Sequence, residues 1–435
     1  MRLGQNFRHR GTAGRVPPLP RPIYALFAVK LVNSMGNFVY PFLTMILTLR
    51  MGWKADRAGR FMTIMQAAGG IGLLLGGKLG DSIGRRRSIL LFQLGAAGLF
   101  LACLIIGMQP SLPYLIAAAN FLLQAEWPVF NAAVADLSGP SSRKRAFALL
   151  YWGNNIGFSI GPLMAGYLFS RNAGLMFAGN AIALFSTSIL LFFLVPETRP
   201  RFPAAADPQI SRAEQAASEE AGSGEAALHG SVFSALARRP LIIAFALVVA
   251  LMNIVYGQGG FGLPLFLDSC FGKAGPELFG RAMAINGLTV VLFTALVTQL
   301  SSKLKPLLGM SLGALLYGAG FGILALIDRG SQSGILLAGL STVIWTLGEI
   351  LSATNQNVFV ASRAPMTHRS RFNSAVNWIS GIGSVLAPLI AGKIMAAGNY
   401  ARFWLSAALM GAAAALLMLL LCLIDSKKEG GQNRL

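Results

Sequence analysis

Residues 77–87 read Gly-Lys-Leu-Gly-Asp-Ser-Ile-Gly-Arg-Arg-Arg, and they join two long apolar runs, 58–80 and 86–108. A helix of about 20 residues crosses a hydrocarbon core of about 30 Å, so each run is long enough to span a membrane. The connection between the runs is short and carries an acidic residue, glycines and three consecutive arginines. The stretch therefore predicts two transmembrane helices joined by a charged loop.

The composition extends this prediction to the whole chain. Of the 435 residues, 54% are hydrophobic and 12% are charged, and the mean hydropathy is +0.61. A soluble domain cannot bury so much apolar surface, so we expect an all-α integral membrane protein. Apolar runs bounded by proline, glycine and charge predict twelve transmembrane helices: 22–49, 58–80, 86–108, 111–138, 144–170, 174–196, 239–267, 277–301, 306–327, 332–361, 370–396 and 400–424.

A stretch of different composition separates the sixth span from the seventh. Residues 197–238 hold several prolines and glutamates among alanine, serine and glycine, and they cannot build a core. They predict a flexible cytoplasmic linker. The expected organisation is a basic tail, a six-helix half, the linker, a second six-helix half and a C-terminal tail: 1–21, 22–196, 197–238, 239–425 and 426–435.

The two halves are related in sequence. Residues 151–168, YWGNNIGFSIGPLMAGYL, align with residues 377–394, NWISGIGSVLAPLIAGKI, and the alignment pairs tryptophan, proline and glycine positions. A second similarity pairs residues 59–62 with residues 280–283. Parallel repeats of six helices are typical of transporters built from two rocking halves, so we expect two pseudo-symmetric halves.

The positions of the basic residues along the chain account for the formal charge of +20. Basic residues crowd the N-terminal tail and alternate connections, such as 85–87, 143–145 and 363–371, whereas the intervening connections are poorer. This positive-inside pattern places both termini in the cytoplasm of a multi-pass cell-membrane protein. The connection after the first span carries Arg50, Lys54 and Arg57 and does not fit the pattern. We still assign it to the outside, because the other connections agree with one another. We expect no nucleic-acid partner.

No catalytic or metal-binding pattern is visible in the sequence. The cysteines and histidines are scattered, and the run at 69–72 lacks the lysine and hydroxyl residue of a phosphate-binding loop. The sequence therefore predicts neither an enzyme nor a cofactor or metal site. Energy would come from a proton or other ion gradient.

With these spans in place, residues 77–86 resemble the loop between helices 2 and 3 of the major facilitator superfamily, usually written G-x-L-x-D-R-x-G-R-R. The matching residues are Gly77, Leu79, Asp81, Gly84, Arg85 and Arg86. Ser82 stands where the pattern has a basic residue. The resemblance implies an alternating-access transporter of a small-molecule substrate, embedded in the lipid bilayer and acting as a monomer.

The charged loop is expected to act as a gate. Asp81 can accept hydrogen bonds from a facing helix N-terminus, whose dipole favours an anion. Arg85 and Arg86 can pair with carboxylates of neighbouring helices. Contacts that hold one conformation and break in the other create a two-state element. The alternative is a loop that only sets topology, and the corresponding stretch 301–306 has no aspartate.

The fifth span carries a second motif. Gly157, Gly161, Pro162 and Gly166 resemble the G-x-x-x-G-P-x-x-G-G pattern of antiporters in the superfamily, with Ala165 in place of one glycine. Small residues four apart let helix backbones approach closely, and proline bends a helix. The resemblance favours export, and ordinary helix packing is the alternative.

Two carboxylates within the predicted spans are candidate proton or substrate sites. An ionisable group in hydrocarbon costs a few kcal/mol even on insertion scales, so Glu126 and Glu349 are functional candidates, with inert structural carboxylates as the alternative. Glu349 begins a polar stripe that ends at Gln356. Proton-coupled exporters of this superfamily commonly have an arginine early in span 4, where Asn120 stands here.

Polar stripes on other spans complete the candidate cavity. Span 1 carries Lys30, Asn33, Asn37 and Tyr40 at helical spacing, and span 11 carries Asn377 in a similar stripe. Such faces should point into water or protein. Lys30 either snorkels to the interface, pairs with Glu126 or meets an anionic substrate. In span 7, residues 253–260 are rich in glycine and predict a break.

These features together predict proton-coupled efflux of small amphipathic or drug-like compounds. In that scheme Glu349, and Glu126 with it, exchanges a proton for substrate. Transport of sugars, peptides, organic anions or lipids remains open, and so does a membrane sensor that transports nothing. Flux driven by a gradient in liposomes would separate the transporters from the sensor.

Overall fold

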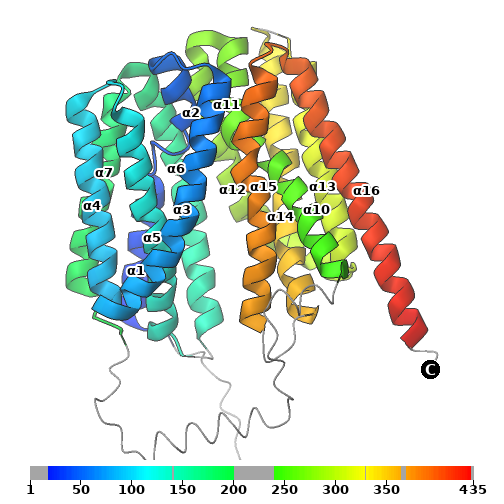
Figure 1. Cartoon of the computed structure of the whole chain (residues 1–435), viewed down its shortest axis with the longest axis horizontal. Coiled ribbons are helices and arrows are strands. Elements are labelled where there is room, and N and C mark those ends of the chain that lie inside the picture. Colours follow the sequence, from blue (N-terminus) through cyan, green and yellow to red (C-terminus); the bar gives the residue numbers. More distant parts are fainter. Residues whose placement is uncertain (1–17, 140–141, 200–239, 329, 364–368, 433–435) are drawn as a thin grey trace, which may run out of the picture.

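The computed structural model describes residues 18–139, 142–199, 240–328, 330–363 and 369–432 (Figure 1). Most of the predicted linker and both ends of the chain lie outside these residues. The described elements are α1 (Arg21–Met35), α2 (Leu43–Met45), η1 (Ile46–Arg50), α3 (Ala55–Ile83), α4 (Arg85–Ile106), α5 (Leu112–Leu137), α6 (Arg143–Arg171), α7 (Gly174–Leu194), α10 (Pro240–Tyr256), α11 (Gln258–Phe271), η2 (Gly272–Ala274), α12 (Gly275–Ser301), α13 (Pro306–Ile323), η3 (Leu324–Leu326), α14 (Gln332–Arg363), α15 (Arg369–Met395) and α16 (Tyr400–Gln432).

The predicted all-α, twelve-span architecture is confirmed, and no strand occurs in the described part of the chain. Two of the spans are interrupted, the first into α1, α2 and η1, and the seventh into α10 and α11. Eight described segments are long and apolar enough to cross a membrane, and one of them runs from Pro240 to Ser301 and so contains α10, α11 and α12. The elements α1, α5 and α6 fall outside that set because they are shorter or more polar.

The first span differs from the single helix predicted at 22–49. Its regular turns stop at Met35 and resume at Leu43. The amide oxygen of Asn180, on α7, accepts hydrogen bonds from the backbone N–H groups of Phe38 and Val39, each at 3.0 Å. A side chain that satisfies backbone donors removes the need for helical bonding there. Asn37 and Tyr40 therefore lie beyond the helix rather than on its predicted stripe.

The seventh span breaks where its glycines predict. α10 ends at Tyr256 and α11 begins at Gln258, with Gly257 between them. A Cβ at Gly257 would lie 2.5 Å from the Cβ of Ala387 on α15. The break thus coincides with a close contact between neighbouring spans.

The two halves meet along two seams of the same construction. Helix α6 packs on α12 and helix α15 packs on α3. A Cβ added at Gly59 would clash with the carbonyl oxygen of Pro388, and one added at Gly280 would clash with that of Pro162. These four residues are the ones that the two sequence repeats align. Each seam is thus a backbone contact that a side chain would prevent.

The second pair of glycines repeats the arrangement. A Cβ at Gly166 would lie 2.7 Å from the carbonyl oxygen of Pro276, and one at Gly392 would lie 2.5 Å from that of Ala55. The structural equivalence of α6 with α15, and of α3 with α12, follows from these paired contacts.

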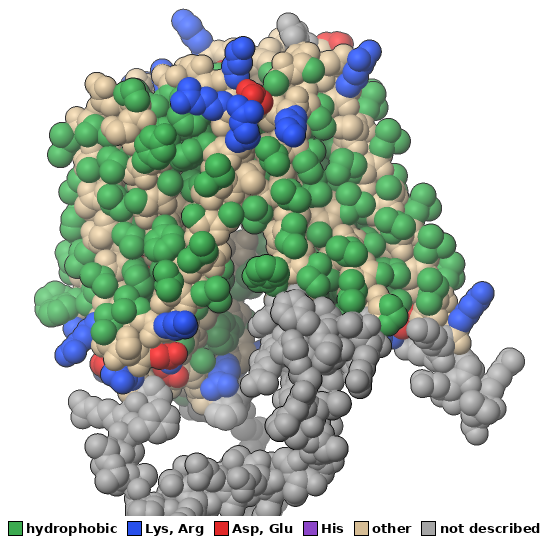
Figure 2. All heavy atoms as spheres, in the orientation of Figure 1, with side chains coloured by type: hydrophobic (Ala, Val, Ile, Leu, Met, Phe, Trp, Pro, Cys, Tyr) green, Lys and Arg blue, Asp and Glu red, His purple; other side chains and the backbone are tan. Residues whose placement is uncertain are grey.

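Both seams lie at one end of the bundle. We call this the Arg171 end, since the α6–α7 connection lies there, and we call the opposite end, with the α3–α4 connection, the Arg85 end. Toward the Arg85 end, nothing lies within 4 Å of a Cβ placed at Gly70 or Gly77 on α3, or at Gly381 on α15. Figure 2 shows the surface hollowed between the halves in the lower part of this view. The halves are closed at the Arg171 end and open at the Arg85 end.

Consecutive glycines on α3 provide a test of this packing. A Cβ at Gly76 would clash with the carbonyl oxygen of Ala125 on α5, whereas a Cβ at Gly77 would meet open space. We expect Gly76→Ala to destabilise the protein by about 1–3 kcal/mol, as overpacking does. Gly77→Ala should not, because alanine favours a helix interior. Thermal unfolding in detergent measures both, and equal melting temperatures would contradict the α3–α5 contact.

Candidate functional site

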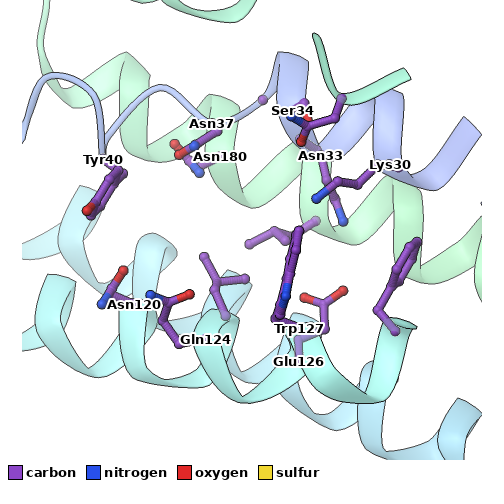
Figure 3. A pocket seen from close by; sticks show the side chains of 16 residues that line it. Lys30, Asn33, Ser34, Asn37, Tyr40, Asn120, Gln124, Glu126, Trp127 and Asn180 are labelled. Atoms are coloured by element: carbon purple, nitrogen blue, oxygen red, sulfur yellow. The ribbon is translucent and has the colours of Figure 1, made fainter. Parts of the chain in front are cut away.

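The structure contains two adjacent cavities within the helical bundle. One, which we call the polar cavity, has a volume of about 310 Å³ and is enclosed by α1, the segment 36–42, α5, α6 and α7, all from the first half (Figure 3). The other, the aromatic cavity, has a volume of about 260 Å³ and is lined by both halves. Tyr40, from the interrupted segment of the first span, lines both.

The polar cavity collects most of the predicted substrate candidates. Figure 3 shows the polar side chains of the first span on one side of the space and those of α5 on the other. The predicted residues in its lining are Lys30, Asn33, Asn37, Asn120 and Glu126. The Nζ atom of Lys30 lies 4.4 Å from the centre of the Trp127 ring. Lys30 thus points into the protein and contacts an aromatic face.

Glu126 is buried and held by a network across three helices. Its Oε1 accepts a hydrogen bond of 2.7 Å from Nε2 of Gln93 on α4. The oxygen of Gln93 in turn accepts from the hydroxyl of Ser188 on α7, at 3.1 Å. Charge–dipole contacts of this kind lower the cost of a carboxylate away from water. Lys30 interacts electrostatically with the same carboxylate.

The aromatic cavity adjoins the second carboxylate. Its lining includes Phe158, Phe279, Trp345, Tyr256 and Asn286. Asn286, on α12, donates from Nδ2 to Glu349 Oε2 and to the hydroxyl of Thr346, each at 2.9 Å. Glu349, on α14, is therefore connected to the cavity wall through the amide of Asn286.

Three of the predicted proton or substrate residues are absent from the lining of both cavities, and one of them, Glu349, is joined to the aromatic cavity through Asn286. Gln356, on α14, and Asn377, on α15, are the other two, and Asn377 is exposed. Ser352 lies between Glu349 and Gln356 on the predicted polar stripe of α14, and it packs against Gly313 of α13 and lines neither cavity. The structure thus separates Gln356 from Glu349.

The charged loop is held within the first half. The backbone at Gly84, with φ of +105°, ends α3 and begins α4, a conformation that favours glycine. Arg85 forms ion pairs with Asp81 and, at 3.4 Å, with Asp136 on α5. Arg86 donates to the carbonyl oxygen of Phe192 and stacks on its ring. Asp81 is 71% exposed, and no hydrogen bond or ion pair between described residues joins it to α15.

Glu197 completes this loop by capping α4. Its Oε1 accepts from the backbone N–H of Arg85 at 2.7 Å, and from those of Thr198 and Arg199, each at 3.0 Å. Burial alone would raise the pKa of Glu197, but backbone hydrogen bonds from Arg199, Arg85, Arg86 and Thr198 lower it below its ordinary value. A carboxylate at a helix N-terminus is further stabilised by the helix dipole.

The motif of the fifth span faces two neighbours. A Cβ at Gly157 or Gly161 would meet the backbone of α1, at 2.5 Å from the oxygen of Leu31 and 2.6 Å from that of Met35. Pro162 and Gly166 lie instead at the seam with α12. Helix α6 therefore contacts both the wall of the polar cavity and the opposite half.

Sequence reasoning missed several residues of these sites. Gln93, Asn180 and Asn286 are single amides in otherwise apolar runs, and that isolation is the signal that could have identified them. Glu197 directly follows the proline that ends the sixth span. Among the described residues, no three His, Cys, Asp or Glu side chains lie together in a group that could hold a metal ion.

Comparisons with known proteins agree on one family. The family model described as Major Facilitator Superfamily matches residues 26–388. The Na(+), Li(+), K(+)/H(+) antiporter of Planococcus maritimus is 22% identical, over 82% of this chain and 85% of that protein. The 3-(3-hydroxy-phenyl)propionate transporter of Escherichia coli (strain K12) is 28% identical, over 75% of each chain.

Solved structures show the same fold. The crystal structure of peptide transporter POT in complex with sulfate superposes with a TM-score of 0.71 at 18% identity, covering 94% of this chain and 95% of that one.

The cap on α4 predicts a pH-dependent stability. Because the pKa of Glu197 is lowered on folding, its contribution is fully present above the ordinary glutamate value of 4.5 and is lost as the pH falls through the lowered value. We expect Glu197→Gln to lower the melting temperature by about 1–2 °C at pH 7 and to match the unsubstituted protein at lower pH. Asp328→Asn, at the Arg171 end, is the control. A difference that does not change with pH would contradict the capping role.

Proposed function

Because the chain belongs to the Major Facilitator Superfamily, it is a multi-pass membrane transporter, and we propose that it exports small amphipathic compounds in exchange for protons. The observation that carries the proposal is Glu349. This carboxylate lies in a membrane-spanning helix and is hydrogen-bonded to Asn286 in the wall of the cavity between the halves. Protonation removes the cost of keeping its charge away from water, and so favours one conformation over the other.

The two cavities support an amphipathic cargo. One is lined by amides, Lys30 and Glu126, and the other mainly by aromatic and apolar side chains. Because Tyr40 lines both, a molecule with a polar and an apolar part can contact both linings. Amphipathic sites of this kind bind small molecules by burying the apolar part and orienting the polar one.

Relatives and the motif of α6 support exchange and export. One relative is an antiporter, and two others transport organic acids, among them the gallate transporter of Pseudomonas putida, 23% identical over 81% of this chain. The direction rests on Gly157, Gly161, Pro162 and Gly166, which resemble the antiporter motif.

The conformation supports alternating access. If the Arg85 end is cytoplasmic, as the charge pattern predicts, the halves are closed to the outside and open to the cytoplasm. We further propose a location in the cell membrane with both termini cytoplasmic, and action as a monomer in the lipid bilayer. The proposal includes no enzymatic activity, no nucleic-acid partner and no cofactor beyond the ion gradient.

The decisive experiment uses purified protein in proteoliposomes with a pH-reporting dye. Amphipathic amines, amphipathic acids, sugars and peptides are added in turn, with a proton gradient of either sign. Proton movement triggered by an amphipathic compound, opposite in direction to its flux, is the expected result. A signal only with sugars or peptides would overturn the cargo class, and silence with every compound would favour a sensor.

Replacing the proposed proton site should abolish coupling. We expect Glu349→Gln to reduce the substrate-triggered proton signal by at least about tenfold, because the glutamine side chain cannot exchange a proton at this pH. Asp328→Asn, an exposed carboxylate outside both cavities, is the matched control and should keep the signal. Full pH-dependent flux in Glu349→Gln would place the proton site elsewhere, with Glu126→Gln the next variant to measure.

The charged loop should affect turnover rather than binding. We expect Asp81→Asn to lower the maximal transport rate about tenfold with little change in KM, because Asp81, which is exposed in this conformation, would pair across the halves in the other conformation. The matched control is Asp56→Asn, which breaks the Asp56–Arg60 ion pair of 3.1 Å at the other end of α3. Equal rates for Asp81→Asn and Asp56→Asn would reduce the loop to a topological role.

A further inference from the structure

The polar cavity has an unusual surplus of hydrogen-bond donors, and it arises from the way three asparagines are anchored. The amide oxygen of Asn33 accepts from Thr187 at 2.7 Å, and that of Asn154 accepts from Ser34 at 3.0 Å. The amide oxygen of Asn180 accepts from two backbone N–H groups of the interrupted first span. In each case the acceptor atom is already used by the protein.

Anchoring the oxygen fixes which end of each amide remains available. A carboxamide has one oxygen and one NH₂ group, so an asparagine whose oxygen is bound to the protein retains two donors. All three asparagines line the polar cavity, and among the hydrogen bonds of the described residues none uses the Nδ2 atoms of Asn33, Asn154 or Asn180. The cavity therefore presents NH₂ groups from α1, α6 and α7.

A charged donor joins these amides. Lys30 contributes its ammonium group from α1, and Figure 3 shows it on the same side of the cavity as Asn33. Nδ2 of Asn120, on α5, does not join them, because it is buried 3.4 Å from the position of a Cβ at Gly69 on α3, outside the cavity.

The charges of the lining decide between ligand classes. Glu126 is the single carboxylate of this lining, and Gln93 already donates to one of its oxygens. Lys30 offsets its charge, so the lining has no net charge but an excess of donors.

A cationic ligand would need free acceptor oxygens, and those of Asn33, Asn154 and Asn180 are taken. The amides of Asn37 and Gln124 in the same lining have no hydrogen bond among the described residues, and they can supply a donor or an acceptor, so they favour neither class.

We infer that the polar cavity recognises the carboxylate group of a small amphipathic acid, through Lys30 and the NH₂ groups of Asn33, Asn154 and Asn180. The inference rests on the proposed function for its biological meaning, and it specifies the charge of the cargo. The apolar part of the acid lies toward Trp127 and Tyr40. Tyr40 also lines the aromatic cavity, so the apolar part can extend into it. The volume of about 310 Å³ is near the lower end of ligand pockets and suits a small acid.

Direct binding tests the inference without transport. Purified protein in detergent is titrated by calorimetry with phenylacetate, its neutral amide and phenethylamine, which share a ring and differ in the polar group. We expect phenylacetate to bind at least about tenfold more tightly than the other two. Tighter binding of the amine, or no binding of phenylacetate, benzoate or hexanoate, overturns the inference.

Two charge variants give effects of opposite sign, which loss of folding cannot imitate. Glu126→Gln removes negative charge from the lining and should tighten phenylacetate binding, whereas it would weaken the binding of a cation. Lys30→Gln should weaken phenylacetate binding about tenfold or more. The control Asn377→Asp changes charge outside both cavities and should leave the affinity unchanged. If Glu126→Gln weakens binding and Lys30→Gln strengthens it, the ligand is a cation and the inference fails.

A third variant isolates the donors. Asn154→Asp keeps the oxygen that accepts from Ser34 and replaces the NH₂ group by an acceptor oxygen, so phenylacetate should bind at least about fivefold more weakly. Unchanged affinity would remove Asn154 from the site and contradict the donor surplus as its basis.

The failures of the two proposals are distinguishable. Binding of phenylacetate without any flux in proteoliposomes would leave the carboxylate site in place and overturn the transport scheme. Proton-coupled flux of amines but not of acids would support the transport scheme and overturn the carboxylate site.

Discussion

Polar groups inside a bilayer have no water to bind, so the protein must supply their partners, and much of this structure follows from that constraint. The side-chain oxygen of Asn180 accepts hydrogen bonds from backbone N–H groups of the first span, in place of helical bonds. Gln93 connects Glu126 to the hydroxyl of Ser188 on α7, and Asn286 donates a hydrogen bond to Glu349. Each carboxylate in the membrane interior is thus accompanied by an amide from another helix.

The same constraint explains where the cavities are. The elements that fail to qualify as apolar spans, α1, α5 and α6, contribute most of the polar side chains of the polar cavity, and α7, which does qualify, adds Asn180. Their polar faces cannot meet lipid, so they turn toward each other and enclose a space. The aromatic cavity lies where the two halves meet, next to the break of the seventh span at Gly257. Function and stability therefore depend on the same few amides.

Much of the architecture could be predicted from the sequence because it depends on local composition. Run lengths identified the spans, glycines identified the break near Gly257, and the two repeats identified the residues that build both seams. The break in the first span was not predictable from its own residues, because Asn180 is distant in sequence. For the same reason Asn37 and Tyr40 reach the cavity from an irregular segment and not from a helical stripe. Which side chains pair across helices, such as Glu197 with the start of α4, cannot be predicted from the sequence, because the partners are brought together only by the fold.

The backbone contacts at the seams have one more consequence. Where Gly59 meets Pro388 and Gly280 meets Pro162, the surfaces that touch are main chain, which every sequence possesses. The place where the halves meet is then set by a handful of positions that must lack a side chain. Residues elsewhere on these helices can change without moving that boundary. A chain built in this way can diverge far in sequence and lining chemistry while its two halves continue to join at the same points.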